Sequence, residues 1–192
     1  YLRVMCQLMS RGKVTGEATV YAHEEVIGIL RSMITMVLDA KDLVCLDKTL
    51  HLVAIEDGET KTILTHPVTF FDIHSTKAKQ FGFTMEYEGK KLTCLGDEPY
   101  NPLNEEYVRN SEWLFCEAFC LYGERDVYHL YEIHHSTVKD ACELAETLSV
   151  HNVVLYHTEE KHKNRKELYT KEGQQYFHGN IIVPEDLETM AL

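Results

Sequence analysis

The sequence lacks long hydrophobic runs and has no excess of positive charge. None of its apolar stretches approaches the roughly 20 residues that a membrane-spanning helix requires, so we expect no membrane role. Its 19 Lys and Arg are outnumbered by 31 Asp and Glu, which gives a formal net charge of −12. Because clustered cations dominate non-specific binding to phosphate backbones, this balance argues against a broad nucleic-acid-binding face. Only a local basic patch around residues 161–166 stays open.

The sequence also lacks closely paired cysteines. None of the six Cys residues forms a Cys-x-x-Cys pair, and no signal-peptide pattern opens the sequence. Neither a disulfide framework nor an oxidising compartment is therefore indicated. We expect reduced, mostly buried thiols in a cytoplasmic protein.

The remaining composition is that of a globular domain. The 192 residues are 44% hydrophobic and 26% charged, which is enough to bury one ordinary core. Residues 1–9 read as the middle of an amphipathic helix without a cap. We therefore expect residues 1–192 to form a single domain that begins inside its fold and lacks its N-terminal portion.

Hydrophobic periodicity predicts strands and helices in mixed order. Hairpins combined with β-α units favour an α+β architecture over a doubly wound parallel sheet. A hydroxyl followed three positions later by a carboxylate, Thr137 and Asp140, has the form of a helix start. The expected helices are 1–9, 23–37, 137–148 and 164–177, and the expected strands are 16–22, 50–55, 62–65, 67–73, 81–87, 92–95, 113–116, 152–156 and 180–183.

Three predicted strands end in residues that can bind a metal ion. His74 follows strand 67–73, Asp97 follows strand 92–95 after a glycine, and His157 follows strand 152–156. Rigid strand ends can hold ligands in a fixed geometry. Taken singly, Gly-Asp is more often a turn and a lone histidine more often structural. Three such strand ends together favour a shared metal site.

His135, Ser136 and Thr137 directly precede the predicted helix 137–148. A helix N-terminus attracts anions, so the imidazole is placed either to give a proton to a leaving oxygen or to clamp a phosphate. The alternative is that His134 and His135 are loop residues beside an ordinary cap.

Together these residues resemble the metallo-β-lactamase-fold hydrolases, and within them the ribonuclease Z-like branch. In that family a strand-end His, a Gly-Asp and a final strand-end His complete a two-zinc site, and they match His74, Asp97 and His157 here. The resemblance implies an αββα sandwich, N-terminally incomplete in this chain. It also implies two divalent metal ions, zinc in the first place and manganese as the alternative.

The resemblance further assigns roles beside the metal ligands. The His-Ser-Thr loop implies that His135 is the proton donor and that Ser136 and Thr137 contact the substrate. The family's strand ending in His-Glu-Ala is matched by Cys116 and Glu117 followed by Ala, so Glu117 is expected to orient His135. Cys116 departs from the usual histidine.

Two larger departures bear on activity and substrate. The family's His-x-His-x-Asp-His motif, which supplies four ligands, does not occur in the chain. With three of seven ligands, we expect weak or absent metal binding unless that motif precedes Tyr1. Asp97 follows His74 by only 23 positions, which leaves no room for the arm that grips tRNA in ribonuclease Z.

We therefore predict a zinc-dependent hydrolase of the phosphodiesterase type, which uses metal-activated water on a phosphodiester or a small nucleic-acid-like substrate. Nucleic acid stays open as a substrate, but not tRNA specifically, and a homodimer also stays open. Two alternatives remain: another ester, thioester or lactam hydrolase on the same fold, and a non-catalytic binding protein that has lost its site.

Overall fold

The computed structural model describes residues 1–190 and divides the chain into two compact units. The first unit is Tyr1–Glu56, and the second begins at Asp57. Each unit has its own cluster of buried hydrophobic residues. That residues 1–192 form one domain stays a prediction.

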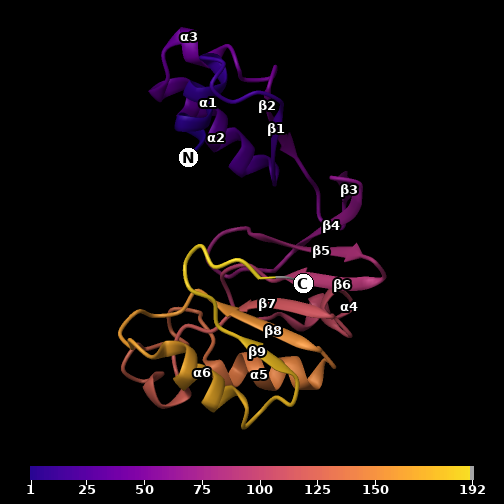
Figure 1. Ribbon diagram of the computed structural model, residues 1–192, viewed down its shortest axis with the longest axis vertical. Helices are drawn as coiled ribbons and strands as arrows, with labels where there is room; N and C mark the ends of the chain where they lie inside the picture. Colours follow the sequence, from indigo (N-terminus) through magenta and orange to yellow (C-terminus); the bar gives the residue numbers. More distant parts are fainter. Residues whose placement is uncertain (191–192) are drawn as a thin grey trace. The chain divides into compact units, whose positions relative to one another are not determined.

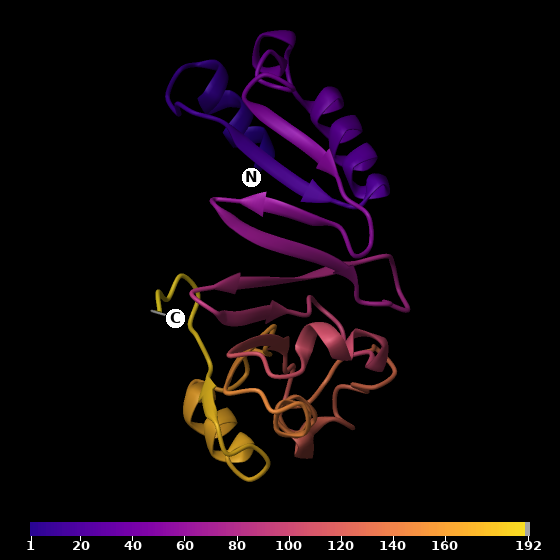
Figure 2. The same ribbon diagram turned by 90° about the vertical axis from the view of Figure 1, so that its right-hand side faces the viewer.

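The first unit is a small parallel β-α-β arrangement. Strands β1 and β2 pair in parallel, with Ala18 opposite Leu50, and helix α2 makes the crossover between them (Figure 2). Apolar residues at helical spacing put Ile27 and Ile34 of α2 into the core beside Cys6. The elements of this unit are α1 Leu2–Ser10, β1 Ala18–Ala22, α2 Glu24–Val37, α3 Ala40–Leu43 and β2 Leu50–Ala54.

The second unit is built on a seven-stranded mixed sheet. The strand order is β3-β4-β5-β6-β7-β8-β9, antiparallel from β3 to β6 and parallel from β6 to β9. The strands are β3 Thr60–Ile63, β4 His66–Asp72, β5 Phe81–Tyr87, β6 Lys90–Cys94, β7 Trp113–Glu117, β8 Asn152–Tyr156 and β9 Asn180–Ile182. The helices are η1 Pro102–Asn104, α4 Glu105–Val108, η2 Tyr122–Glu124, α5 Val138–Thr147 and α6 Arg165–Gly173.

Local sequence explains two of the sharp features of this unit. Glu88 and Gly89 both have positive φ, 51° and 77°, as a two-residue hairpin between β5 and β6 requires. Helix α5 begins in a capping box, in which the Thr137 hydroxyl accepts from the Asp140 N–H and the Asp140 carboxylate accepts from the Thr137 N–H.

The main core lies between the sheet and helix α5. Buried Leu114 of β7 and Leu155 of β8 belong to one cluster with Ala141 and Ala145 of α5. The alanines let the helix approach the strands closely. Figure 1 shows α5 and α6 along the β8–β9 end of the sheet.

Most of the predicted elements are confirmed, and the mixed α/β architecture is confirmed with them. Helix α6 ends at Gly173, before the predicted residue 177, and the short helices α3 and α4 were not predicted. All six cysteines are free, and all except the half-buried Cys94 are buried, as expected. Among residues 1–190 no helix combines the length and apolar character needed to cross a membrane.

Candidate active site

Parallel strands bring three of the predicted residues to one edge of the sheet. Strands β6, β7 and β8 run in the same direction, so their carboxyl ends lie together. Asp97 follows β6, Glu117 is the last residue of β7, and His157 directly follows β8. His157 has φ +53°, in the left-handed region that non-glycine residues rarely adopt. Such backbone conformations are often found at functional sites.

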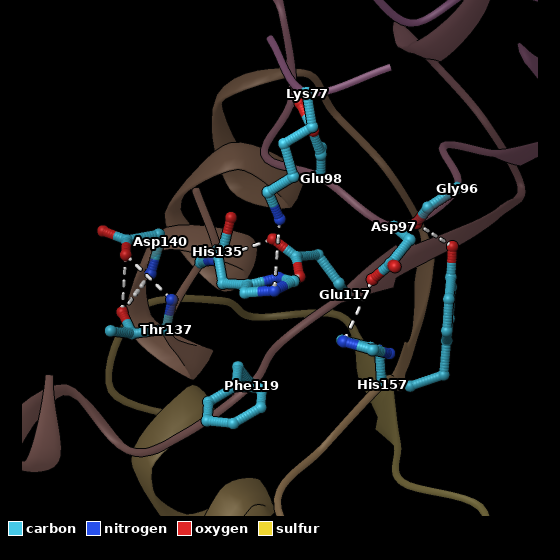
Figure 3. Close-up of polar contacts among 12 residues, drawn as sticks. Lys77, Gly96, Asp97, Glu98, Glu117, Phe119, His135, Thr137, Asp140 and His157 are labelled. Carbon is cyan, nitrogen blue, oxygen red and sulfur yellow. Dashed lines mark hydrogen bonds and ion pairs between the residues drawn. The ribbon is translucent and has the colours of Figure 1, made fainter. Parts of the chain in front are cut away.

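Asp97 and His157 form a partly exposed pair. The His157 Nε2 lies 3.0 Å from the Asp97 Oδ1, and the two side chains are 41% and 50% exposed (Figure 3). The Tyr156 hydroxyl donates to the Gly96 carbonyl and so fixes the turn that carries Asp97. The Asp97 Oδ1 is buried, and the His157 Nε2 is its partner, although the contact does not have hydrogen-bond geometry. A carboxylate oxygen and an imidazole nitrogen this close can bind one cation between them.

Glu117 and His135 form a buried pair beside the first. The His135 Nδ1 lies 2.5 Å from the Glu117 Oε2, and the Ser136 backbone N–H donates to the Glu117 Oε1 at 2.8 Å. Glu117 is 1% exposed. Burial raises the pKa of Glu117, and the hydrogen bond with His135 opposes that rise. Both carboxylate oxygens are thus engaged, and the His135 Nε2 remains the ring atom that faces the site.

Two aromatic rings flank His135. The Phe119 ring stacks on the His135 ring, with 5.4 Å between the ring centroids. The His157 ring also stacks on the His135 ring, with 5.0 Å between the centroids. The Lys77 Nζ lies 3.5 Å from the His135 Nε2 (Figure 3). The imidazole is therefore held by the Glu117 carboxylate and by ring contacts, with a cation beside its outer nitrogen.

Ser136 and Thr137 lie next to His135, and both are already engaged in hydrogen bonds within the protein. Thr137 is fully buried, and its hydroxyl takes part in the cap of α5. Ser136 is buried, and its backbone N–H binds Glu117. That these two residues contact a substrate stays a prediction.

His74 does not join the group formed by the other site residues. It is exposed, has φ +57°, and follows β4, which β5 separates from β6 in the sheet. Since neighbouring strands are about 4.8 Å apart, the end of β4 lies two strand spacings to the side of the end of β6. That His74 is a metal ligand stays a prediction.

The donor set at this edge suits a divalent metal ion. Asp97, Glu117, His135 and His157 offer nitrogen or oxygen atoms that all lie within 4.8 Å of one another. Both oxygens of Glu117 are already hydrogen-bonded, and the His135 Nε2 lies beside the Lys77 ammonium. The atoms left to bind an ion are therefore the Asp97 Oδ1 and the His157 Nε2. Carboxylate and imidazole together suit zinc and manganese.

A second acidic group stabilises the loop after β8. The His162 Nε2 lies 2.9 Å from the Glu124 Oε1, and buried Glu159 accepts from the Tyr128 hydroxyl and the Lys161 N–H. The Tyr128 ring packs edge-on against Phe119, 5.3 Å between centroids. This network therefore supports Phe119, whose ring stacks on that of His135.

Sequence reasoning missed Lys77 and Glu98. Glu98 is 5% exposed and accepts from the Ser75 hydroxyl at 2.6 Å and from the Thr76 N–H at 3.1 Å. These contacts join positions more than 20 residues apart in the chain. No local motif marks them.

Comparisons with known proteins agree with this fold. The family model described as Beta-lactamase superfamily domain matches residues 5–158. Ribonuclease Z from Shouchella clausii (strain KSM-K16) is 29% identical over 104 residues, which are 54% of this chain and 32% of that protein. The chain thus spans about a third of the length of this curated relative.

Solved structures with low sequence identity share the fold. The metallo-beta-lactamase fold protein YhfI from Bacillus subtilis has a TM-score of 0.72 at 15% identity, and the aligned region covers 96% of this chain and 68% of YhfI. The short form of human tRNase Z has a TM-score of 0.63 at 14% identity, covering 92% and 68%. A diphosphatase from the PhnP family has a TM-score of 0.62 at 15% identity, covering 89% and 56%. The predicted metallo-β-lactamase fold is confirmed.

Proposed function

This chain belongs to the beta-lactamase superfamily, and we propose that it carries the proton-donating part of a metal-dependent phosphodiesterase. The observation that supports this most is the buried Glu117–His135 pair beside the exposed Asp97–His157 pair. One pair can hold and orient a proton donor, and the other presents metal ligands.

The metal would be held by the Asp97 carboxylate and the His157 imidazole, with zinc as the expected ion and manganese as the alternative. Bound divalent ions supply Lewis acidity and an activated water at neutral pH. The buried Asp97 Oδ1, 3.0 Å from the His157 Nε2, supports this assignment. A carboxylate oxygen and an imidazole nitrogen at this distance can bind the same ion.

His135 would act as the general acid. Its Nδ1 is bound to the Glu117 carboxylate, which orients the ring so that the Nε2 faces the open side of the site. The Ser136 N–H fixes the other oxygen of Glu117, which keeps the carboxylate from rotating away. Glu117 therefore positions His135, and His135 gives its Nε2 proton to the leaving oxygen.

The chemistry of the similar proteins favours phosphate esters, since a ribonuclease and a diphosphatase are among them. Between His74 and Asp97 this chain has only the β5–β6 hairpin. A phosphodiester smaller than tRNA is therefore the proposed substrate, cleaved between phosphorus and the leaving oxygen that His135 protonates.

The test uses the protein from its full reading frame, loaded with zinc or manganese. We expect at least one metal ion per chain by elemental analysis and cleavage of bis(p-nitrophenyl) phosphate. The variant His157→Ala should lose metal and activity together. A matched control is His178→Ala, because His178 is an exposed histidine paired with Glu146 away from the site residues.

Two outcomes would overturn the proposal. The first is less than one metal ion per chain with no cleavage of the diester, which would favour a non-catalytic binding protein. The second is cleavage of a lactam or thioester in preference to the diester, which would favour the other hydrolases of this fold.

A further inference from the structure

Lys77 brings a positive charge to the proton donor from a separate part of the chain. It lies in the loop between β4 and β5, and its Nζ is 3.5 Å from the His135 Nε2. Within residues 1–190, Lys77 forms no ion pair with a carboxylate. Because the chain has 31 acidic and only 19 basic residues, most ammonium groups are expected to have a carboxylate nearby, and Lys77 departs from that expectation.

Hydrogen bonds to Glu98 anchor the loop that carries Lys77. The buried Glu98 carboxylate accepts from the Ser75 hydroxyl and the Thr76 N–H. The Ser75 Oγ in turn accepts from the backbone N–H groups of Lys77 and Ala78, at 3.2 and 3.3 Å. The backbone at Lys77 is therefore fixed, and its side chain extends from this fixed point toward His135 (Figure 3).

Two nitrogen atoms converge at this point, and within residues 1–190 neither is paired with a carboxylate on the open side of the site. The Glu117 carboxylate is bound to the opposite edge of the His135 ring, at Nδ1, and both carboxylate oxygens are hydrogen-bonded. The Lys77 Nζ and the His135 Nε2 are 3.5 Å apart, so one anion on the open side can contact both atoms. A lysine ammonium acts as a point charge for phosphate oxygens.

We propose that Lys77 Nζ and His135 Nε2 together form an anion subsite for a non-bridging oxygen of a phosphodiester. This inference rests on the proposed function and specifies its substrate class: the bound group carries a negative charge at the reacting centre. Lys77 holds the phosphoryl oxygen, and His135 reaches the neighbouring leaving oxygen. Neutral esters and lactams gain nothing from Lys77.

The same loop provides a matched control. Lys79 lies two positions further on, and its Nζ is placed over the Phe81 ring, 5.2 Å from the ring centroid. Lys77→Met and Lys79→Met remove the same charge from the same loop, so their effects on net charge are equal. Any difference between them reports the position of the ammonium group.

The experiment titrates the metal-loaded, full-length protein with inorganic phosphate and follows the His135 ring signals by NMR. We expect phosphate to shift these signals in the wild type and in Lys79→Met. In Lys77→Met, the dissociation constant should rise about tenfold or more, the range expected for loss of one charge-assisted hydrogen bond. Lys77→Arg should restore most of the affinity, because a cation is retained.

Equal phosphate affinity in Lys77→Met and Lys79→Met would overturn the subsite. A parallel assay with bis(p-nitrophenyl) phosphate separates this result from the proposed function. If phosphate binding depends on Lys77 but the wild type cleaves no diester, the subsite stands and the phosphodiesterase proposal fails. If the wild type cleaves the diester and Lys77→Met does so with unchanged KM and kcat, the function stands and the subsite fails.

Discussion

At the scale of single residues, the Glu117 carboxylate is the acidic group of the site whose burial depends most on matched hydrogen bonds. It is 1% exposed and accepts hydrogen bonds on both oxygens, from the His135 Nδ1 and the Ser136 N–H. Glu117→Gln keeps the shape but turns one acceptor into an NH₂ donor, which must face one of these groups. We expect a loss of about 1–3 kcal/mol in the free energy of unfolding, the usual cost of an unmatched buried polar group.

Urea denaturation followed by Trp113 fluorescence measures this loss. The matched control is Glu143→Gln on α5, where a 52% exposed carboxylate lies 3.7 Å from the Lys139 ammonium. Exposed pairs of this kind contribute little, so Glu143→Gln should stay within about 0.5 kcal/mol of the wild type. Equal stability of the two variants would show that Glu117 does not hold His135 as described.

At the scale of secondary-structure elements, strand β5 depends on a glycine. A Cβ added at Gly82 would lie 2.6 Å from the Cys94 carbonyl oxygen and 2.8 Å from ring atoms of fully buried Phe71. The carbonyl belongs to the backbone of β6 and the ring lies in the core, so neither can move away freely. Gly82→Ala should therefore destabilise the protein by about 1–3 kcal/mol, the usual cost of overpacking.

Thermal unfolding tests this prediction, since a loss of 1 kcal/mol lowers the midpoint by roughly 2–4 °C in a chain of this size. Gly123→Ala in η2 is the control, because its added Cβ meets no atom within 4 Å and its φ is not positive. We expect the midpoint of Gly123→Ala to stay close to that of the wild type. A Gly82→Ala variant as stable as this control would mean that β5 and β6 can separate without cost.

Elements with strong local signals were predictable from the sequence. The apolar runs before Asp97 and His157 predicted β6 and β8, and the spacing of Thr137 and Asp140 predicted the start of α5. Helix α4 has only four residues, which is too short for helical periodicity to appear. Its existence depends on tertiary packing, since Val108 is fully buried in the main core.

At the scale of the whole molecule, the order of strands in the sheet was the missing information. His74, Asp97 and His157 all follow predicted strands, but the sequence does not say that the parallel strand β7 lies between β6 and β8. The contact between Lys77 and His135 joins positions 58 apart. Such a contact follows from how loops meet at the sheet edge, so local patterns carry no signal for it.

The charge of the whole molecule predicts how it treats nucleic acids. With a net charge of −12, the chain should repel a phosphate backbone except at a local cluster of cations. The candidate cluster at residues 161–166 is largely neutralised: Lys161 pairs with Glu124, Arg165 with Glu185 and Lys166 with Glu188. We therefore expect no tight, non-specific binding to RNA.

Fluorescence anisotropy with a labelled single-stranded RNA tests this expectation. Lowering the salt from about 200 to about 50 mM should leave the affinity weak and nearly unchanged, because few counterions are released when few phosphates are neutralised. The double variant Lys161→Ala/Lys163→Ala should behave like the wild type. If the wild type instead binds RNA with a steep salt dependence that the double variant loses, residues 161–166 form a nucleic-acid interface despite the net charge. The substrate would then be sought among RNAs, because the local cations would outweigh the repulsion from the rest of the chain.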